Sequence, residues 1–515
     1  MQGNQRVRVL QDLSMGMLGY SGIPQDARLM FKTFSHLPGV DVTGLLAEMG
    51  PGFTRRTRTS KFDARQAEVF NGSIFLLGVS GIQTDHAHTR LARLKRRLQI
   101  MREPLQRYGV SPLHYHSLDD AIWRLYFEKT LDAADRPHIL RQKFALTNLN
   151  FVTYLQRLQA RIFFAPRLDT QGYDFLVTSE PRPIKLSAGT RHIARFHDAI
   201  PITDADMFDS VGVVNTAFNM VRRSSPDAIF ACVSQPSEDA LLRIFPRLSG
   251  RTVVIPNALP EIPADNSKDM PIVEIVRTRA SNASWGTEDE RTVLRKGALD
   301  QLTPDKPLRY ILAVSTLEPR KNLTSVVRAW ERVRYQHDPD LKLIIVGHPG
   351  WRFEPTLAAM RPRILDGSLL HLQDVSSAEL QALYAQAECF VSPSFAEGFG
   401  FPPLEAAQWD TPAIVSDIPA HRWALGDAAL YVDPYSVPDL ANKIVRLVVA
   451  DDREALKREL RAKAARVLAR YAPGTVGDQW ADLFDRLRKG GPVAANGAMQ
   501  DVTTKNAGFD LAAAE

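Results

Sequence analysis

The chain has 515 residues, of which 44% are hydrophobic and 24% charged, and this composition excludes collagen-like, low-complexity and wholly disordered proteins. The formal net charge of +6 is too small to indicate nucleic-acid binding, and two cysteines, Cys232 and Cys389, cannot form a disulfide scaffold. No apolar run approaches the roughly 20 residues of a membrane helix, and the first residues lack the apolar core of a signal peptide, so we expect a multi-domain cytoplasmic protein.

Short apolar runs alternate with amphipathic stretches from the amino terminus onward. This pattern predicts strands at 6–13, 173–179, 192–200 and 228–234, and helices at 26–37 and 237–245. Residues 86–158 depart from the alternation and predict a mostly helical insertion. Within it, 90–107 form a basic amphipathic helix with seven Lys or Arg and one acidic residue.

The alternation resumes after a stretch rich in Pro, Asp, Ser, Asn and Thr. Strands are predicted at 310–315, 341–347, 389–392 and 412–416, and helices at 323–335 and 378–388. Two alternating blocks predict two α/β domains that face a cleft, each a parallel sheet with helices on both sides. The boundaries that we infer are 1–259 and 307–489 for the domains, 260–306 for a linker that is helical around 290–299, and 490–515 for a disordered tail.

The segment 390–405 carries the most chemical information. A strand ends at Ser392, a glycine-containing loop follows, and Pro402 and Pro403 open a helix whose free N–H groups favour an anion. Glu397 in the loop and Glu405 in the predicted first helical turn could accept hydrogen bonds from a sugar and a ribose. The alternative is that Glu405 only complements the helix dipole and that the glycines only turn the chain.

Three further segments lie between a predicted strand and a predicted helix. In 315–322, Arg320 and Lys321 are adjacent cations at a helix start, where a diphosphate would explain them better than the helix dipole does. A solvated basic turn is the other interpretation. The loop 18–25 contains Gly22, and 195–201 contains His197 followed by Asp198; taken alone, a histidine at this place is more often structural.

Together these segments resemble the GT-B retaining glycosyltransferases of glycosyltransferase family 4, which include bacterial polysaccharide mannosyltransferases. The resemblance is strongest over 310–434. It depends on Glu-Pro-Arg-Lys-Asn at 318–322, on the strand and turn at 344–350, and on two glutamates eight residues apart, Glu397 and Glu405. The amino-terminal half matches more loosely, through 21–24, 197–198, Ser234 and 254–257.

The resemblance implies a role for each matching residue. Two Rossmann-like domains would face a cleft, with the nucleotide-sugar bound by the carboxyl-terminal one. Catalysis would depend on the residues that hold the diphosphate and orient the sugar, namely Arg320, Lys321, Glu397 and His197. Donor binding would use two cations, two glutamates and a set of small or aromatic loop residues: Gly22, Ser315, Arg320, Lys321, Glu397, Gly398, Phe399, Gly400, Phe401 and Glu405.

The resemblance further implies that the leaving diphosphate helps to deprotonate the acceptor and that no cofactor or metal is needed, because two cations replace the metal. The pairs His86 with His88 and His114 with His116 could bind a metal, but they are remote in sequence from the donor motifs. GDP-mannose is the expected donor, ahead of a UDP-sugar or dTDP-rhamnose, and the acceptor would be a growing glycan or lipid-linked glycan of a bacterial surface polysaccharide.

Three alternatives stay open from sequence. A nucleotide-sugar epimerase or a sugar phosphorylase would share this architecture, and a non-catalytic carbohydrate- or nucleotide-binding module would share the motifs. The basic helix at 90–107 could dock on an anionic membrane at its cytoplasmic face, or its apolar stripe could pack on the protein core. Nucleic acid is not an expected partner, because no aromatic stacking pattern accompanies the basic residues.

Overall fold

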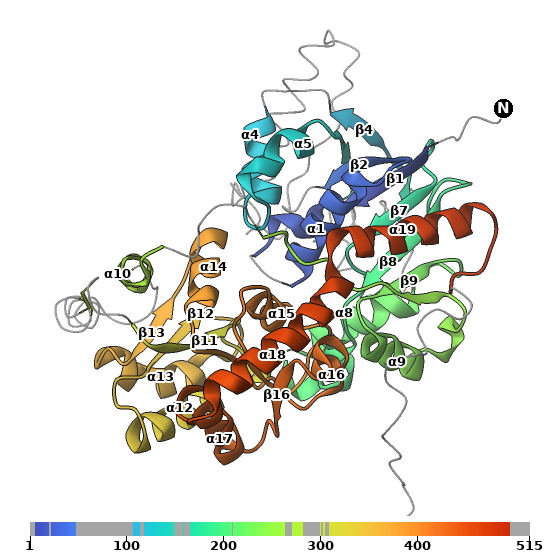
Figure 1. Cartoon of the computed structure of the whole chain (residues 1–515). Coiled ribbons are helices and arrows are strands. Elements are labelled where there is room, and N and C mark those ends of the chain that lie inside the picture. The colour runs from blue at the N-terminus through green and yellow to red at the C-terminus, as the bar shows by residue number, and fades with distance from the viewer. Residues whose placement is uncertain are drawn as a thin grey trace, which may run out of the picture.

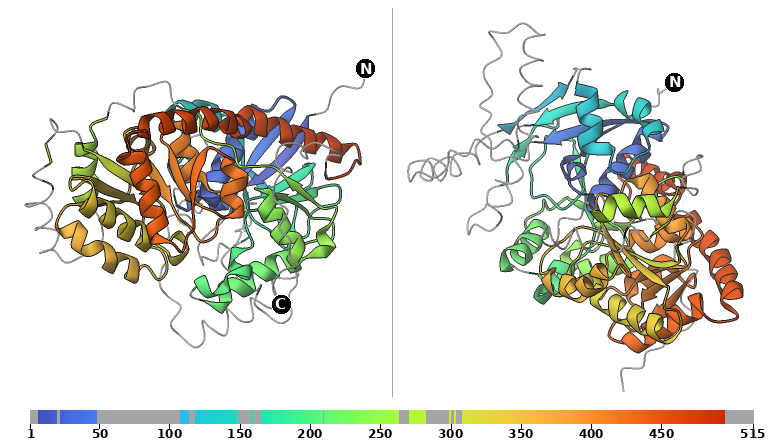
Figure 2. Two further views of the ribbon diagram at one scale, coloured as in Figure 1. Left: turned by 60° about the horizontal axis from the view of Figure 1, so that its bottom comes forward. Right: turned by 90° about the vertical axis from the view of Figure 1, so that its left-hand side faces the viewer.

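The computed structural model describes residues 6–19, 22–47, 107–113, 118–147, 149, 158, 165–208, 210–262, 270–281, 299, 302–303 and 308–494. In these residues the chain forms two large sheets with helices against their faces, one from each half of the sequence, and one short two-stranded sheet (Figures 1 and 2). The two-domain α/β arrangement expected from the strand–helix alternation is confirmed. None of the helices described here has the length and apolar character needed to cross a bilayer.

The amino-terminal sheet has, within the described residues, the strand order β10-β9-β8-β7-β1-β2-β5-β4. Its strands run parallel except β4, which is antiparallel to β5 at the edge. The strands are β1 (Val7–Asp12), β2 (Val40–Ala47), β4 (Val110–Leu113), β5 (Lys143–Thr147), β7 (Phe175–Thr178), β8 (Arg191–Phe196), β9 (Ile229–Cys232) and β10 (Thr252–Val254). A separate short pair joins β3 (Arg107–Tyr108) to β6 (Arg167–Leu168).

The helices of this half connect successive strands. They are α1 (Ile23–His36), α4 (Asp119–Ile122), which continues into a π-helical turn η5 (Trp123–Phe127), α5 (Arg136–Leu140), α7 (Ile200–Thr203), α8 (Val211–Arg222) and α9 (Gln235–Ile244). Single 3-10 turns are η1 (Ser14–Met17), η6 (Ala133–Asp135), η7 (Ala205–Met207) and η8 (Pro246–Leu248).

The carboxyl-terminal sheet is parallel throughout, in the order β13-β12-β11-β14-β15-β16. Its strands are β11 (Tyr310–Val314), β12 (Lys342–Val346), β13 (Leu369–Leu372), β14 (Cys389–Ser392), β15 (Ala413–Ser416) and β16 (Ala429–Val432). The helices are α10 (Ile272–Ser281), α12 (Leu323–Gln336), α13 (Glu354–Leu365), α14 (Ser377–Ala385), α15 (Phe401–Gln408), α16 (Pro419–Leu425), α17 (Val437–Val448), α18 (Arg453–Leu468) and α19 (Pro473–Arg488), with 3-10 turns η11 (Pro319–Lys321) and η12 (Ala469–Tyr471).

The register of β11 and β14 positions the two most informative motifs. Leu312 pairs with Phe390, so both strands end at the same edge of the sheet. Both strands are almost wholly buried, as expected for a parallel sheet covered by helices on both faces. The loops that follow, 315–322 and 393–400, therefore leave the sheet side by side.

Several segments differ from the sequence expectation. The described part of the predicted helical insertion contains short helices but also β3, β4 and β5, because Lys143–Thr147 is a short, largely buried segment that pairs with β2. The strand expected at 192–200 ends at Phe196, which leaves His197 and Asp198 in a loop. Most of the basic helix expected at 90–107 lies outside the described residues, and its last residue, Arg107, belongs to β3.

The predicted domain limits remain a prediction, but two segments pack differently from what those limits suggest. Helix α10, in the predicted linker, packs on β13, and Arg279 pairs with Glu379 of α14 at 2.7 Å. Helix α19 returns to the amino-terminal half (Figure 1), where Trp480 and Phe484 pack against Phe34 with ring centroids 5.1 and 5.5 Å apart. Of the predicted tail, residues 495–515 lie outside the described residues.

Candidate active site

A cavity of about 650 Å³ lies between the two halves, at the carboxyl edges of their sheets. Every site residue named from the sequence lines it, from both domains: Gly22, His197, Ser315, Arg320, Lys321, Glu397, Gly398, Phe399, Gly400, Phe401 and Glu405. The structure thus brings together residues that are as far apart in sequence as 22 and 405.

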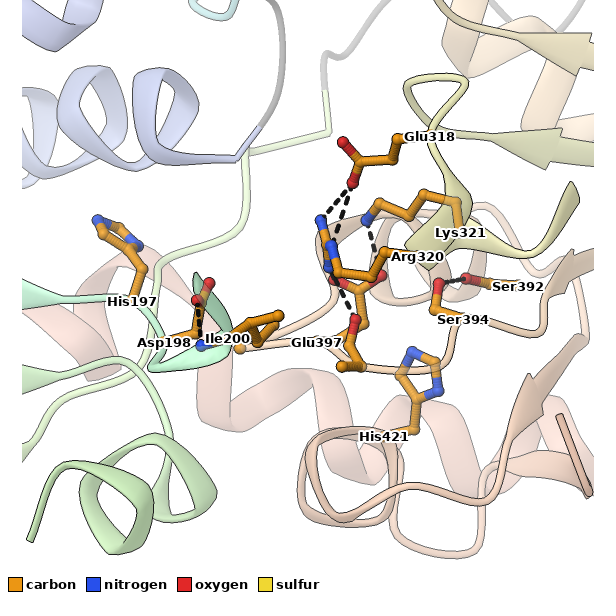
Figure 3. A network of polar contacts seen from close by, with 12 residues as sticks. His197, Asp198, Ile200, Glu318, Arg320, Lys321, Ser392, Ser394, Glu397 and His421 are labelled. Carbon is orange, nitrogen blue, oxygen red and sulfur yellow. Dashed lines mark hydrogen bonds and ion pairs between the residues drawn. The ribbon is translucent and has the colours of Figure 1, made fainter. Parts of the chain in front are cut away.

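The centre of the cavity wall is a cluster of paired charges. Arg320 Nη1 donates to Glu397 Oε2 at 2.8 Å, and Lys321 Nζ donates to Glu397 Oε1 at 2.6 Å (Figure 3). Arg320 Nη2 also donates to Glu318 Oε1 at 2.7 Å, and Glu318 is only 3% exposed. Each cation is therefore paired with a carboxylate, and the cluster combines two cationic and two carboxylate side chains.

The pKa values show how strongly these groups interact. Burial by itself would raise the pKa of Glu397, but the charges of Lys321 and Arg320 outweigh it and hold that pKa far below its usual value. Burial, and then the neighbouring Arg320, lower the pKa of Lys321. A diphosphate that entered here would bring negative charge next to both cations and would favour the charged form of Lys321.

Gly398 lies where the two domains touch. Ser234 Oγ, at the start of α9, donates to the carbonyl oxygen of Gly398 at 2.6 Å, and Ser237 Oγ donates to the same oxygen at 3.2 Å. A Cβ at residue 398 would come within 2.2 Å of the carbonyl oxygen of His197. Only glycine fits this contact, so this loop belongs as much to the domain interface as to the cavity.

Glu405 also joins the two domains. Its Oε1 accepts from Gln25 Nε2 of α1 at 2.5 Å, and its Oε2 accepts from the Tyr384 hydroxyl of α14 at 3.0 Å. Because α15 begins at Phe401, Glu405 lies in the second helical turn and not in the first as expected, which argues against a role as partner of the helix dipole. A carboxylate can accept further hydrogen bonds, so Glu405 could bind ribose hydroxyls while it keeps these partners.

The other predicted residues sit at the edges of the cavity. Gly22 is the N-cap of α1 with a φ of 66° and open space where a Cβ would be. The Ser315 hydroxyl is buried and has no hydrogen-bond partner among the described residues. His197 Nε2 donates to the carbonyl oxygen of Ser179 at 2.9 Å, and burial lowers the pKa of His197. A neutral ring that donates through Nε2 leaves Nδ1 as an acceptor.

The cavity contains several groups that were not predicted as site residues. Glu318 and Asp198 were visible within the motifs, but nothing in the sequence indicated that they face the cations. Lys129, from the segment after the π-helical turn, also lines the cavity. Trp351 lines the cavity from the β12–α13 loop and stacks on Phe208 of the amino-terminal half, with ring centroids 5.3 Å apart.

The expectation that the protein needs no metal remains a prediction. Among the described residues no group of three or more His, Cys, Asp or Glu has the arrangement of a metal site. The four histidines considered from sequence, at 86, 88, 114 and 116, lie outside the described residues.

Part of the chain that forms this cavity matches a known protein family. Residues 298–466 match the family model of glycosyl transferases group 1. The chain contains a glycosyltransferase group 1 domain. The matched range includes Arg320, Lys321, Glu397 and Glu405 of the cavity wall.

Curated relatives agree with this match. The chain is 32% identical over 142 residues to O-antigen chain mannosyltransferase B of Escherichia coli, which is 28% of this chain and 37% of that protein. It is 36% identical over 125 residues to the O-antigen chain mannosyltransferase RfbU of Salmonella typhimurium, which is 24% of this chain and 34% of that protein. The chain thus spans about a third of the length of these relatives.

The likeness to a solved structure extends over most of the chain but concerns the fold alone. The sucrose-phosphate synthase of Thermosynechococcus elongatus superposes with a TM-score of 0.54 at 16% identity, covering 94% of this chain and all of that one. The two-domain GT-B fold that the sequence motifs implied is therefore confirmed.

Proposed function

We propose that this protein is a retaining glycosyltransferase that moves mannose from GDP-mannose to a growing glycan or lipid-linked glycan in bacterial surface polysaccharide synthesis. The observation that carries the proposal is the Arg320–Lys321–Glu397 cluster, which faces a cavity between two domains within a group 1 glycosyltransferase domain. The mannosyltransferase names of the curated relatives support the choice of sugar.

The cations give the reaction its electrostatic stabilisation. Arg320 and Lys321 would hold the diphosphate and stabilise the charge that develops as it leaves. Glu397, fixed between them, would orient hydroxyls of the donor sugar, and the N–H groups of Phe399 and Gly400 would contribute hydrogen bonds. Glu405 would hold the ribose. Because two cations already offset the diphosphate, we expect that the reaction does not require a divalent metal.

Three contacts between the domains support a reaction that occurs in a closed cleft. Gln25 to Glu405, Ser234 to Gly398, and Trp351 to Phe208 each join one domain to the other. Closure of this kind excludes water, which would otherwise hydrolyse the donor.

The lipid-linked acceptor is proposed from the resemblance to bacterial polysaccharide mannosyltransferases. A lipid-linked acceptor would bring the enzyme to the inner face of the cytoplasmic membrane, where the basic segment 90–107 could bind anionic headgroups. Flotation with anionic and neutral vesicles, with and without Arg93, Lys95, Arg96 and Arg97 changed to Gln, tests this directly. Equal recovery in the soluble fraction for all vesicles would contradict membrane binding.

The proposed function is tested with the full chain and a panel of nucleotide-sugars. GDP and GDP-mannose should raise the melting temperature more than UDP-glucose or dTDP-rhamnose, because a ligand that binds only the folded state stabilises it by mass action. With an oligosaccharide acceptor, the product should carry α-linked mannose, and activity should survive prolonged EDTA treatment. Release of free sugar or an epimerised nucleotide-sugar without transfer would contradict the proposal, and loss of activity restored by magnesium would contradict metal independence.

A further inference from the structure

Two serine hydroxyls of the amino-terminal domain meet one carbonyl oxygen of the other domain. Ser234 Oγ is 2.6 Å from the carbonyl oxygen of Gly398, and Ser237 Oγ is 3.2 Å from the same oxygen. Ser234 is fully buried and Ser237 is 3% exposed. Neither serine is among the described residues that line the cavity. They can therefore influence a bound ligand only through the groups that they contact.

The first turn of α9 places both hydroxyls. Ser234 is the N-cap of this helix, and its Oγ accepts from the backbone N–H of Ser237 at 3.2 Å. The two hydroxyl oxygens are 2.9 Å apart. Because the N–H of Ser237 occupies one lone pair of the Ser234 oxygen, the Ser234 proton can point out of the helix toward Gly398.

Ser237 also contacts the loop that carries His197. Its Oγ is 2.7 Å from the carbonyl oxygen of His197, so its single proton lies between two carbonyl oxygens, one from each domain. A Cβ at residue 398 would lie 2.2 Å from that same oxygen of His197. The hydroxyl pair and the absence of a side chain at Gly398 together set the distance between the His197 loop and the loop that carries Glu397.

The contact that fixes the Gly398 carbonyl also fixes the next N–H along the chain. No cis peptide bond occurs in the described residues, and in a trans peptide the C=O and the N–H lie in one plane and point in opposite directions. The carbonyl of Gly398 and the N–H of Phe399 belong to the same peptide unit. Since the serines bind the carbonyl from the amino-terminal domain, the Phe399 N–H points away from them.

The Phe399 N–H is available to a ligand. Phe399 lines the cavity and is 4% exposed. Within the described part of the chain its N–H has no hydrogen-bond partner. A buried N–H without a partner is costly, and the hydroxyl oxygens of a bound sugar can accept from it.

We propose that Ser234 and Ser237 are positioning residues of the transfer reaction, an inference that rests on the function proposed above. While the domains are together, their hydroxyls fix the Gly398–Phe399 peptide so that its N–H donates to the sugar of the bound nucleotide-sugar. They also fix the backbone next to Glu397, which orients the same sugar. The donor-binding loop is therefore complete only in contact with the amino-terminal domain, in the closed cleft from which water is excluded.

The test compares Ser234→Ala with Ser436→Ala in the full chain. Ser436 is the N-cap of α17, and its Oγ accepts from the N–H of Asp439 at 3.2 Å within its own domain. Both variants lose a helix cap of the same geometry, but only Ser234→Ala loses the contact with Gly398. Its turnover number should fall by about five- to twentyfold, because a buried carbonyl oxygen loses its closer donor. Ser436→Ala should keep the wild-type turnover number.

Ser237→Ala is a second variant that leaves the cap of α9 in place, because the N–H of residue 237 still reaches Ser234 Oγ. It keeps the closer donor to Gly398, so turnover should fall less, by about two- to fivefold. Since either hydroxyl can partly replace the other at the Gly398 oxygen, the double variant should lose more than the product of the two single losses. A loss equal to that product would contradict a shared contact with this peptide.

The affinity for GDP distinguishes positioning from binding and from packing. Arg320 and Lys321, which would hold the diphosphate, are unchanged, so the Kd for GDP, measured by titration calorimetry, should stay within about twofold of the wild type in Ser234→Ala. Ser234→Cys introduces a weaker donor of similar size and should have a turnover number between those of Ser234→Ala and the wild type. A Kd that rises as much as turnover falls, or a change confined to the melting temperature, would overturn the positioning role.

Failure of this inference and failure of the proposed function give different results. If the wild type transfers sugar and Ser234→Ala matches Ser436→Ala in turnover, the positioning role is overturned while the proposed function stands. If the wild type and Ser436→Ala transfer no sugar from any nucleotide-sugar, the proposed function itself fails. Should Ser234→Ala not fold, Ser237→Ala and Ser234→Cys provide the same comparison, and wild-type turnover in both would overturn the positioning role.

Discussion

The two halves of the cavity are assembled in different ways. The carboxyl-terminal half uses two short loops that leave adjacent strands, so Arg320, Lys321 and Glu397 meet because β11 and β14 are paired. In the amino-terminal half, the buried side chain of Arg28 links two segments: it donates to backbone oxygens of Gly16, Leu18 and Gly19 and also to the carbonyl oxygen of Tyr126, 98 residues away. One half depends on sheet register and the other on long-range hydrogen bonds, and substitutions should affect them differently.

The sharpest test of this comparison is Lys321→Ala in the carboxyl-terminal half. If Lys321 stabilises the leaving diphosphate, its loss should reduce turnover by about 10²–10³-fold, or ~3–4 kcal/mol. The melting temperature should change less than turnover does, because the strands that position the loop are untouched. Steady-state kinetics with GDP-mannose measure the first effect and thermal unfolding the second.

Lys463→Ala serves as the control for loss of a lysine. Lys463 lies on α18 and pairs with Glu459 at 2.7 Å on the surface, where an ion pair contributes little. Near-wild-type turnover in a folded Lys321→Ala protein would refute the role assigned to the cation.

Arg28→Met should show the opposite pattern in the amino-terminal half. Methionine fills similar space but leaves the carbonyl oxygens of the 16–19 loop and of Tyr126 without their donor. We expect the free energy of unfolding to fall by about 3 kcal/mol, since hydrogen bonds from a charged donor in the interior are lost together. Chemical denaturation measures this loss.

Arg28→Lys is the graded control, because an ammonium keeps the charge but cannot reproduce the planar fork. Its free energy of unfolding should lie between those of the wild type and of Arg28→Met. An unchanged unfolding free energy in Arg28→Met would show that the amino-terminal loop does not depend on this side chain.

The same contrast explains what could be predicted from sequence. The strand–loop–helix order of 310–322 and 389–408 is local, so Arg320, Lys321, Glu397, Glu405 and the sheet edge on which they lie were predictable. The interactions of Glu405 with Gln25 and of Arg28 with Tyr126 cross 380 and 98 residues. No periodicity or motif records contacts of that range, and so Lys129, Asp198 and Trp351 were not assigned to the site.

The next prediction concerns Glu405, which forms hydrogen bonds with both halves. Glu405→Gln keeps the shape but removes the negative charge, and charge-assisted hydrogen bonds are worth ~1.5–3 kcal/mol. If Glu405 holds the ribose, the Kd for GDP, measured by titration calorimetry, should rise by about ten- to a hundredfold.

Gln25→Met is the matched variant, since it removes the interdomain hydrogen bond and keeps the carboxylate. A smaller loss of GDP affinity than in Glu405→Gln supports ribose binding. An equal loss would instead indicate that Glu405 acts by closing the domains, and a change confined to the melting temperature would leave it with a structural role alone.

The smallest effect is expected at the stack between Trp351 and Phe208, where each half contributes one ring. Aromatic pairs contribute about 0.5–1.5 kcal/mol beyond their burial, so Trp351→Leu should lower kcat/KM by about two- to tenfold through weaker closure. Phe208→Leu removes the same contact from the other domain and should have a similar effect. Because the two rings share one interaction, the double variant should lose little more than either single one.

Trp351→Phe keeps a ring for stacking but loses the hydrogen bond from Nε1 to the carbonyl oxygen of Met207, 2.8 Å long, and so measures that bond separately. Losses that add in the double variant would show that Trp351 acts on the donor directly, and the stack would then not be a contact through which the two halves close.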